Sequence, residues 1–283
     1  MEQLSRIKDR IGSLEDLGGL IRALRALSAS HVQEAQGALP GIVNYVEAVE
    51  DAIAEALALS TGSSGRDMPS GNSGADVVIV ICAEHGFVGA FNERLLDRAV
   101  TECADRPNAR LAVVGRRGAM LAEERGIAAD WSFPMAIDVA SVLGVTRHTA
   151  RVLSDAVHAR IVYADYRPGG NYEIAMKTIL PIDPAVLARA GGTGAPMCHL
   201  APDLLLERLA EEYLFSEITR AVMQSLASEN GARLRVMESA DRSIGDKLDV
   251  LHRDERVLRQ EAITSELLDV VVGSEAVSGP GRP

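Results

Sequence analysis

The chain has few of the residues that build disulfide frameworks, metal sites or thick aromatic cores. Three cysteines stand among its 283 residues, at Cys82, Cys103 and Cys198, and they form no CxxC pair. The six histidines are scattered as well, so we expect no metal ion and no other cofactor. Aromatic residues make up 4% of the chain, and this scarcity favours helices that meet along thin aliphatic seams.

Long apolar runs and a surplus of positive charge are also missing. No stretch approaches the ~20 apolar residues of a membrane-spanning helix, and the N-terminus does not resemble a signal peptide. The net charge is −11, whereas a nucleic-acid partner would require a basic face. Residues 1–59 hold five Lys and Arg against nine Asp and Glu, and residues 203–275 hold nine against sixteen. These differences, −4 and −7, account for the whole net charge of −11. An excess of acidic residues in both terminal segments is typical of solvated helix faces.

Proline is absent from the 69-residue stretch from Leu204 to Val272. As a helix, this stretch would be roughly 100 Å long, more than a globular domain needs. Its apolar residues recur at steps of three and four, with Glu255 as the one polar member: Met237, Ala240, Ile244, Leu248, Leu251, Leu258 and Ala262. This pattern predicts a coiled-coil seam, and such a seam requires a partner helix.

The same period runs through the first 59 residues. Its positions are Leu4, Ile7, Ile11, Leu14, Gly18, Ile21, Arg25, Ser28, Val32, Ala35, Leu39, Ile42, Val46, Val49, Ile53 and Ala56. Pro40 would remove one helical hydrogen bond, at a cost of ~3 kcal/mol. Because the register continues across Pro40, we predict one helix from Met1 to Leu59. A hairpin that turns between Gly37 and Gly41 is the alternative.

Strands and helices alternate in the middle of the chain. Asp76–Cys82 is a continuous β-branched run, which is typical of a strand buried on both faces. The elements expected after it are a helix at Glu93–Cys103, a strand at Arg110–Val114, a helix at Gly118–Arg125, a strand at Ile127–Trp131, a helix at Val139–His158, and a hairpin of strands Arg160–Tyr166 and Tyr172–Leu180. This alternation predicts a Rossmann-like α/β domain, with linkers at Ser60–Ala75 and Gly191–Pro196.

No residues have the arrangement of a catalytic centre. Gly86–Ala90 lies between a strand and a helix, where dinucleotide folds bind pyrophosphate, but its spacing is not GxGxxG. Arg116 and Arg117 could bind an anion or form an exposed basic turn. His148 and His158 lie ten residues apart on an expected helix, with no carboxylate placed to orient either. Two readings stay open: a nucleotide- or ligand-binding α/β protein with a coiled-coil dimerisation arm, and a coiled-coil adaptor.

Five segments match one known family. Ser225–Arg233 is similar to its ESLASEHAAR stretch, and Arg259–Leu267 is similar to its RQAAITQEL stretch. Gly86–Asn92 is similar to GLCGGFN, Ile21–Ala35 aligns with ITKAMKMVAAAKLRRA, and Val272–Ala276 resembles the family's glycine–alanine end. With these segments, the chain resembles the gamma subunits of rotary F-type ATP synthases over its whole length.

The departures from the family concentrate at two places. Its lysine and arginines fall here on His31, Gln33 and Glu34, and its YN pair falls on Glu255 and Arg256. These departures make the chain resemble a divergent branch, such as the alternative, sodium-linked ATPases.

The resemblance implies both an architecture and a function. The architecture is a long antiparallel two-helix coiled coil formed by the N- and C-termini (residues 1–59 and 203–275), with an inserted Rossmann-like α/β domain (residues 76–195). The function is that of a non-catalytic central-stalk subunit, which couples ion flow to ATP synthesis or hydrolysis in other subunits. The implied partners are alpha- and beta-type ATPase subunits, an epsilon-type subunit and a membrane c-ring, with one copy per complex on the cytoplasmic face of the membrane. The implied rotor contacts are Leu24, Arg25, Arg259, Gln260, Thr264 and Glu266.

Overall fold

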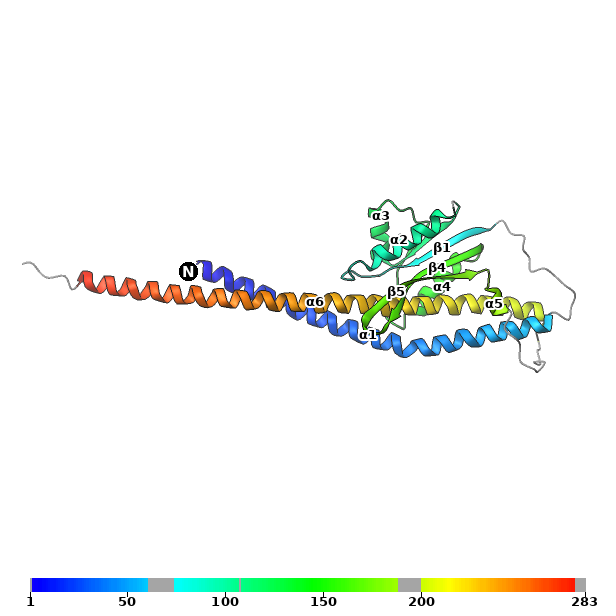
Figure 1. Cartoon of the computed structure of the whole chain (residues 1–283), viewed down its shortest axis with the longest axis horizontal. Helices are drawn as coiled ribbons and strands as arrows, with labels where there is room; N and C mark the ends of the chain where they lie inside the picture. Colours follow the sequence, from blue (N-terminus) through cyan, green and yellow to red (C-terminus); the bar gives the residue numbers. More distant parts are fainter. Residues whose placement is uncertain (1, 61–73, 107, 188–199, 278–283) are drawn as a thin grey trace, which may run out of the picture. The chain divides into compact units, whose positions relative to one another are not determined.

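The computed structural model describes residues 2–60, 74–106, 108–187 and 200–277, and Figure 1 shows their elements. By their contacts, the residues form two units. Unit 1 combines Met1–Ala26 with Met237–Pro283, and unit 2 contains Leu27–Val236. The linker expected at Gly191–Pro196 lies outside the described residues, as does all but the two ends of the linker expected at Ser60–Ala75.

Two long helices begin and end the described part of the chain. Helix α1 spans Glu2–Ser60 and helix α6 spans Pro202–Val277. Helix α1 continues through Pro40, so the prediction of one helix is confirmed and the hairpin alternative is wrong. Every position of the predicted α1 stripe except Arg25 is buried or partly buried. The hydrophobic period therefore identified the packed face of α1 along its length.

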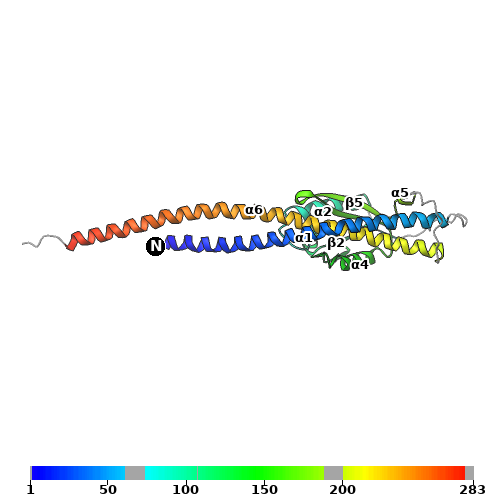
Figure 2. The same ribbon diagram turned by 90° about the horizontal axis from the view of Figure 1, so that it is seen from below.

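The two helices run antiparallel in unit 1. Gly18 of α1 lies beside Ile244 of α6, where a Cβ on the glycine would be 3.5 Å from the isoleucine Cγ2. Arg25, seven residues further along α1, pairs with Asp241, three residues back along α6. Figure 2 shows the start of α1 beside the orange part of α6. The predicted α6 stripe faces this contact, since all its members from Met237 to Ala262 are buried or partly buried.

Unit 2 contains a five-stranded sheet with the strand order β3-β2-β1-β4-β5. The strands are β1 Ala75–Ile81, β2 Arg110–Val114, β3 Trp131–Phe133, β4 Ala156–Arg167 and β5 Asn171–Leu180. The first four run parallel, and β5 is antiparallel to β4. The shorter helices are α2 Phe91–Ala104, α3 Arg116–Glu124, α4 Val142–Val152 and α5 Pro184–Leu187, and a 3-10 turn at Pro168–Gly170 joins β4 to β5. The predicted α/β class and the hairpin are confirmed.

Strand β1 is buried on both faces, as its β-branched run predicts. Val77, Ile79 and Ile81 face one apolar cluster, which includes Val142 of α4 and Ile218 of α6. The alternate residues of β1, such as Val78 and Val80, face a second cluster with α2 and α3. The sheet is thus covered on both sides, which is the layer order of a Rossmann-like domain.

Two predicted boundaries are wrong. Strand β3 begins at Trp131 rather than Ile127, and helix α4 ends at Val152, so His158 belongs to strand β4. Ala156 and His158 pair with Ala75 and Asp76 of β1, with a register shift between the two pairs. Alanine, valine and histidine suit helix and strand alike, and here pairing with β1 decides the outcome.

Candidate functional site on the helix pair and the strand ends

Leu24 and Arg25 lie on α1 in unit 1. Leu24 is partly buried and Arg25 is exposed. The guanidinium of Arg25 lies 3.3 Å from the carboxylate of Asp241 on α6, and the guanidinium of Arg22 lies 3.6 Å from the same carboxylate. Because the arginine side chains are about half exposed, this cluster adds little stability. The cluster does fix which sides of α1 and α6 face each other near Asp241.

The other four implied contacts lie further along α6. Arg259, Gln260, Thr264 and Glu266 are all exposed. Arg259 is eighteen residues beyond Asp241, or about 27 Å along the helix, so the structure does not bring these four to Leu24 and Arg25. Arg259 pairs with Glu255, and the Thr264 hydroxyl donates to the carbonyl oxygen of Gln260 at 2.9 Å.

Glu255 is the one acidic member of the α6 seam. Burial raises the pKa of its carboxyl, but the hydrogen bond and charge of Arg259 and the charge of Lys8 on α1 outweigh burial, so the net pKa is below its ordinary value. The carboxylate therefore stays ionised in the seam. A charged seam residue weakens helix pairing but fixes its register.

The end of α6 leaves a set of apolar residues uncovered. More than half of each side chain is exposed for Ile263, Leu267, Leu268, Val270, Val271 and Val272. Helix α1 is described from Glu2 onward, and in unit 1 its first residues face α6 near Glu255. We did not single out this apolar end from the sequence, although the aliphatic run from Val270 to Val272 was a signal for it.

The loop after β1 is bound to the protein's own carboxylates. Oε2 of Glu84, which is 7% exposed, accepts hydrogen bonds from the backbone N–H groups of Arg116 (3.1 Å) and Met135 (2.8 Å). The carboxylate of Glu229 on α6 accepts from the N–H groups of Glu84 (3.2 Å) and His85 (3.4 Å). Glu84 thus occupies the start of α3, where its carboxylate accepts a hydrogen bond from the first N–H group of that helix.

Arg233 of α6 belongs to the same hydrogen-bond network. Its guanidinium donates to the carbonyl oxygens of Gly86 (3.1 Å) and His85 (3.3 Å) and pairs with Glu229. Because Glu229 and Arg233 bind the backbone of His85 from both its N–H and its carbonyl group, the loop has the geometry of a strand-to-helix connection held against α6. Arg116 pairs with Glu84 at 3.2 Å, so the alternative of an anion site at Arg116 and Arg117 gains no support. Sequence reasoning missed Glu84, because a buried carboxylate in a loop has no sequence pattern.

The comparisons with known proteins agree with this architecture. A model of the family described as ATP synthase matches residues 3–277. The chain belongs to the ATP synthase family. Two of its relatives are ATP synthase gamma chains, from Lachnoclostridium phytofermentans (26% identical, covering 98% of this chain and 100% of the relative) and from Sorangium cellulosum (28% identical, covering 98% and 99%).

Solved structures of ATP synthases share the fold. The Euglena gracilis mitochondrial ATP synthase, in a structure of its OSCP, F1 and c-ring, has a chain with a TM-score of 0.64 at 14% identity, covering 99% of this chain and 97% of that one. A structure of the Tetrahymena thermophila central stalk and c-ring gives a TM-score of 0.55 at 15% identity, covering 78% and 99%. At such identities the likeness shows the fold.

Two further features of this ATP synthase family member concern membranes and thiols. Among the described residues, none of the helices has the length and apolarity needed to cross a membrane. Cys82 is buried and Cys103 is partly buried, and burial raises the pKa of both thiols. Raised pKa values keep both thiols protonated and unreactive, as expected of structural cysteines.

Proposed function

We propose that the chain is the central-stalk, or rotor, subunit of a rotary ATP synthase or ATPase. In this role it couples ion flow through a membrane sector to ATP synthesis or hydrolysis in other subunits. Membership of the ATP synthase family and relatives named gamma chain support the proposal. Ion selectivity lies in other subunits, so the proposal covers proton- and sodium-driven complexes alike.

The observation that carries the proposal is the antiparallel helix pair, in which α6 extends beyond its seam with α1. The seam buries the apolar stripe of α6 as far as Ala262, and the residues beyond it keep an exposed apolar surface. A soluble protein rarely exposes such a surface unless a partner covers it. A ring of alpha- and beta-type ATPase subunits around this end would supply the cover.

The mechanism that follows is mechanical. A stiff, asymmetric helix pair contacts each catalytic subunit differently, and its rotation shifts each subunit between conformations. Leu24, Arg25, Arg259, Gln260, Thr264 and Glu266 are the proposed contacts with the ring. The chain itself performs no chemistry, and it holds no nucleotide in this proposal.

We further propose an epsilon-type subunit and a membrane c-ring as partners, with one copy of the chain per complex. The complex would lie on the cytoplasmic face of the membrane, with this chain as a peripheral subunit. The solved structures that share the fold come from rotor, F1 and c-ring assemblies, which supports this choice of partners.

The test is a purification of the tagged chain from its native membrane extract. We expect alpha- and beta-type subunits and ATPase activity in the purified material, and no binding of nucleotide to the isolated chain. Recovery of the chain alone or paired with itself would contradict the proposal. Micromolar nucleotide binding by the isolated chain would favour the ligand-binding alternative instead.

A further inference from the structure

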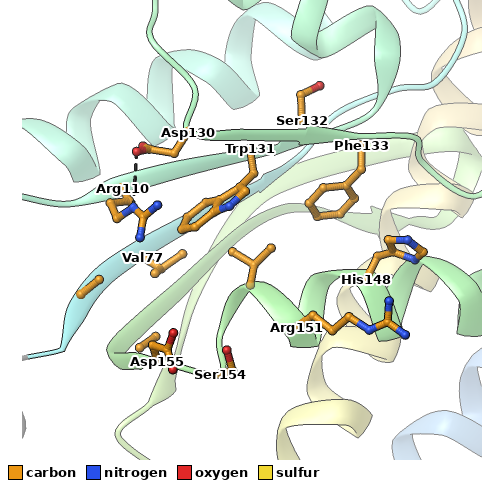
Figure 3. Close-up of a pocket in the computed structure, with 13 residues that line it drawn as sticks. Val77, Arg110, Asp130, Trp131, Ser132, Phe133, His148, Arg151, Ser154 and Asp155 are labelled. Atoms are coloured by element: carbon orange, nitrogen blue, oxygen red, sulfur yellow. Dashed lines mark hydrogen bonds and ion pairs between the residues drawn. The ribbon is translucent and has the colours of Figure 1, made fainter.

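An open groove on unit 2 lies apart from the loop after β1. It has a volume of ≈ 710 Å³ and lies between helix α4 and the edge strand β3, near the starts of β1 and β2 (Figure 3). Its floor is apolar, with Val77, Val152 and the rings of Trp131 and Phe133. Because the groove is open on one side, an extended segment of a partner could lie along it.

One wall of the groove carries unpaired positive charge. Helix α4 (VLGVTRHTARV) contains no acidic residue, and Arg147, His148 and Arg151 on it are exposed. Within residues 2–60, 74–106, 108–187 and 200–277, none of the three forms an ion pair. Arg147 and Arg151 are spaced i, i+4, an arrangement in which like charges destabilise a helix. An acidic partner would offset this repulsion.

One of the aromatic rings already lies beside a cation. The guanidinium carbon of Arg110 lies 4.0 Å from the centroid of the Trp131 ring, and Arg110 also pairs with Asp130 at 3.4 Å. The rings of Phe133 and His148 lie 6.4 Å apart. Because Arg110 neutralises Asp130, that carboxylate does not oppose an acidic ligand.

One acidic residue makes the two ends of the groove differ in charge. Asp155 lies at the opposite end of the groove from His148 and Arg151 (Figure 3). Within the described part of the chain, Asp155 has no ion pair. A segment bound with its carboxylates toward α4 gains attraction from Arg151 and avoids Asp155, whereas the reverse orientation loses both advantages.

We propose that this groove docks an extended acidic segment of a partner protein, with its carboxylates on α4 and an apolar side chain on Trp131 and Phe133. A small anion fits less well, because the cations line separate parts of an open groove and none is deeply buried. The inference does not depend on the rotor proposal, since it concerns only the face of the α/β domain formed by α4 and β3.

The experiment uses the fact that Trp131 is the chain's single tryptophan. The full chain is titrated with a blocked peptide of six glutamates and one leucine. Calorimetry measures binding, and Trp131 fluorescence reports whether the groove is the site. We expect saturable binding with a change in Trp131 fluorescence, both of which weaken as salt concentration rises.

Three variants separate the groove from general electrostatics. Arg151→Glu should weaken binding about fivefold, because it changes the screened charge at the rim by two units, and Asp155→Asn should strengthen binding about twofold, because it changes that charge by one unit. Arg117→Glu on α3 makes the same charge change away from the groove and should leave affinity unchanged. All three residues are exposed, and circular dichroism checks that each variant folds.

Four results of the peptide titrations would overturn the proposal. They are the absence of binding by calorimetry, binding without a change in Trp131 fluorescence, equal affinity for a peptide with glutamine in place of glutamate, and equal loss in Arg117→Glu and Arg151→Glu. An identical fluorescence response to inorganic phosphate alone would instead assign the groove to small anions, which also contradicts docking of a segment.

Discussion

Single side chains hold the loop after β1 in place. Oε2 of Glu84 accepts two backbone hydrogen bonds, and Oε1 pairs with Arg116 at 3.2 Å. Glu84→Gln keeps the size but leaves one oxygen for these donors. We expect a loss of about 1–3 kcal/mol in the free energy of unfolding, measured by urea titration. Glu123→Gln, at an exposed position of α3, is the control and should cost less than about 0.5 kcal/mol. Equal effects would contradict a structural role for Glu84.

A glycine fixes how closely α3 approaches β1. A Cβ at Gly118 would lie 2.0 Å from the Cβ of Cys82 and 2.6 Å from its Sγ. Gly118→Ala should therefore destabilise unit 2 by about 1–3 kcal/mol through overpacking, seen as a lower urea midpoint. Gly12→Ala on α1 is the matched control, because a Cβ there meets nothing within 4 Å. It should raise stability by up to about 1 kcal/mol, as alanine favours a helix. A neutral Gly118→Ala would contradict the packing described.

For single residues, the sequence predicted buried apolar positions better than buried polar ones. The stripes at steps of three and four located Ile21, Val46 and Ile244, which are all buried. The sequence did not locate Glu84, because burial of its carboxylate depends on donors that the fold brings together from the start of α3 and the segment after β3. The six rotor contacts stay predictions, since the structure contains no partner to contact them.

Among the elements, the long helices and the strands β1, β2, β4 and β5 followed directly from hydrophobic period and β-branched runs. The boundary between α4 and β4 did not. Asp138 and Ser141 set the start of α4, since the Ser141 N–H donates to the Asp138 carboxylate at 2.8 Å. Pairing of Ala156–His158 with β1 sets its end. Long-range pairing of this kind cannot be read from a local pattern.

Pro40 offers a test of the continuous helix α1. It lies inside the helix and is exposed, so replacing it changes a backbone hydrogen bond and leaves the packing intact. Pro40→Ala should raise the stability of unit 2 by up to about 3 kcal/mol, measured as a higher thermal midpoint by circular dichroism. Pro40→Gly restores the N–H group but adds backbone freedom, so its gain should be smaller. A lower midpoint for Pro40→Ala would mean that the helix needs its proline.

For the whole molecule, the decisive feature is a folded chain that still exposes an apolar helix end. Leu267 and Leu268 are 61% and 59% exposed, so they contribute little to the stability of the isolated chain. The double change Leu267→Glu with Leu268→Glu should leave the thermal midpoint of the isolated chain within about 2 °C. It should lower the yield of complex assembled with alpha- and beta-type subunits, measured by gel filtration after mixing. Replacement of Asp246 and Asp249 by glutamate, which keeps their charge, is the control on an exposed part of α6. Normal assembly of the double leucine variant would contradict a ring seated on this end.

The most direct test of the rotor proposal is to watch the chain turn. Alpha- and beta-type subunits are fixed to a surface, and a probe is attached to an engineered cysteine in unit 2 of this chain. On addition of ATP, we predict stepwise rotation of the probe in one direction that stops when the nucleotide is removed. A complex that hydrolyses ATP while the probe stays fixed would contradict the central claim.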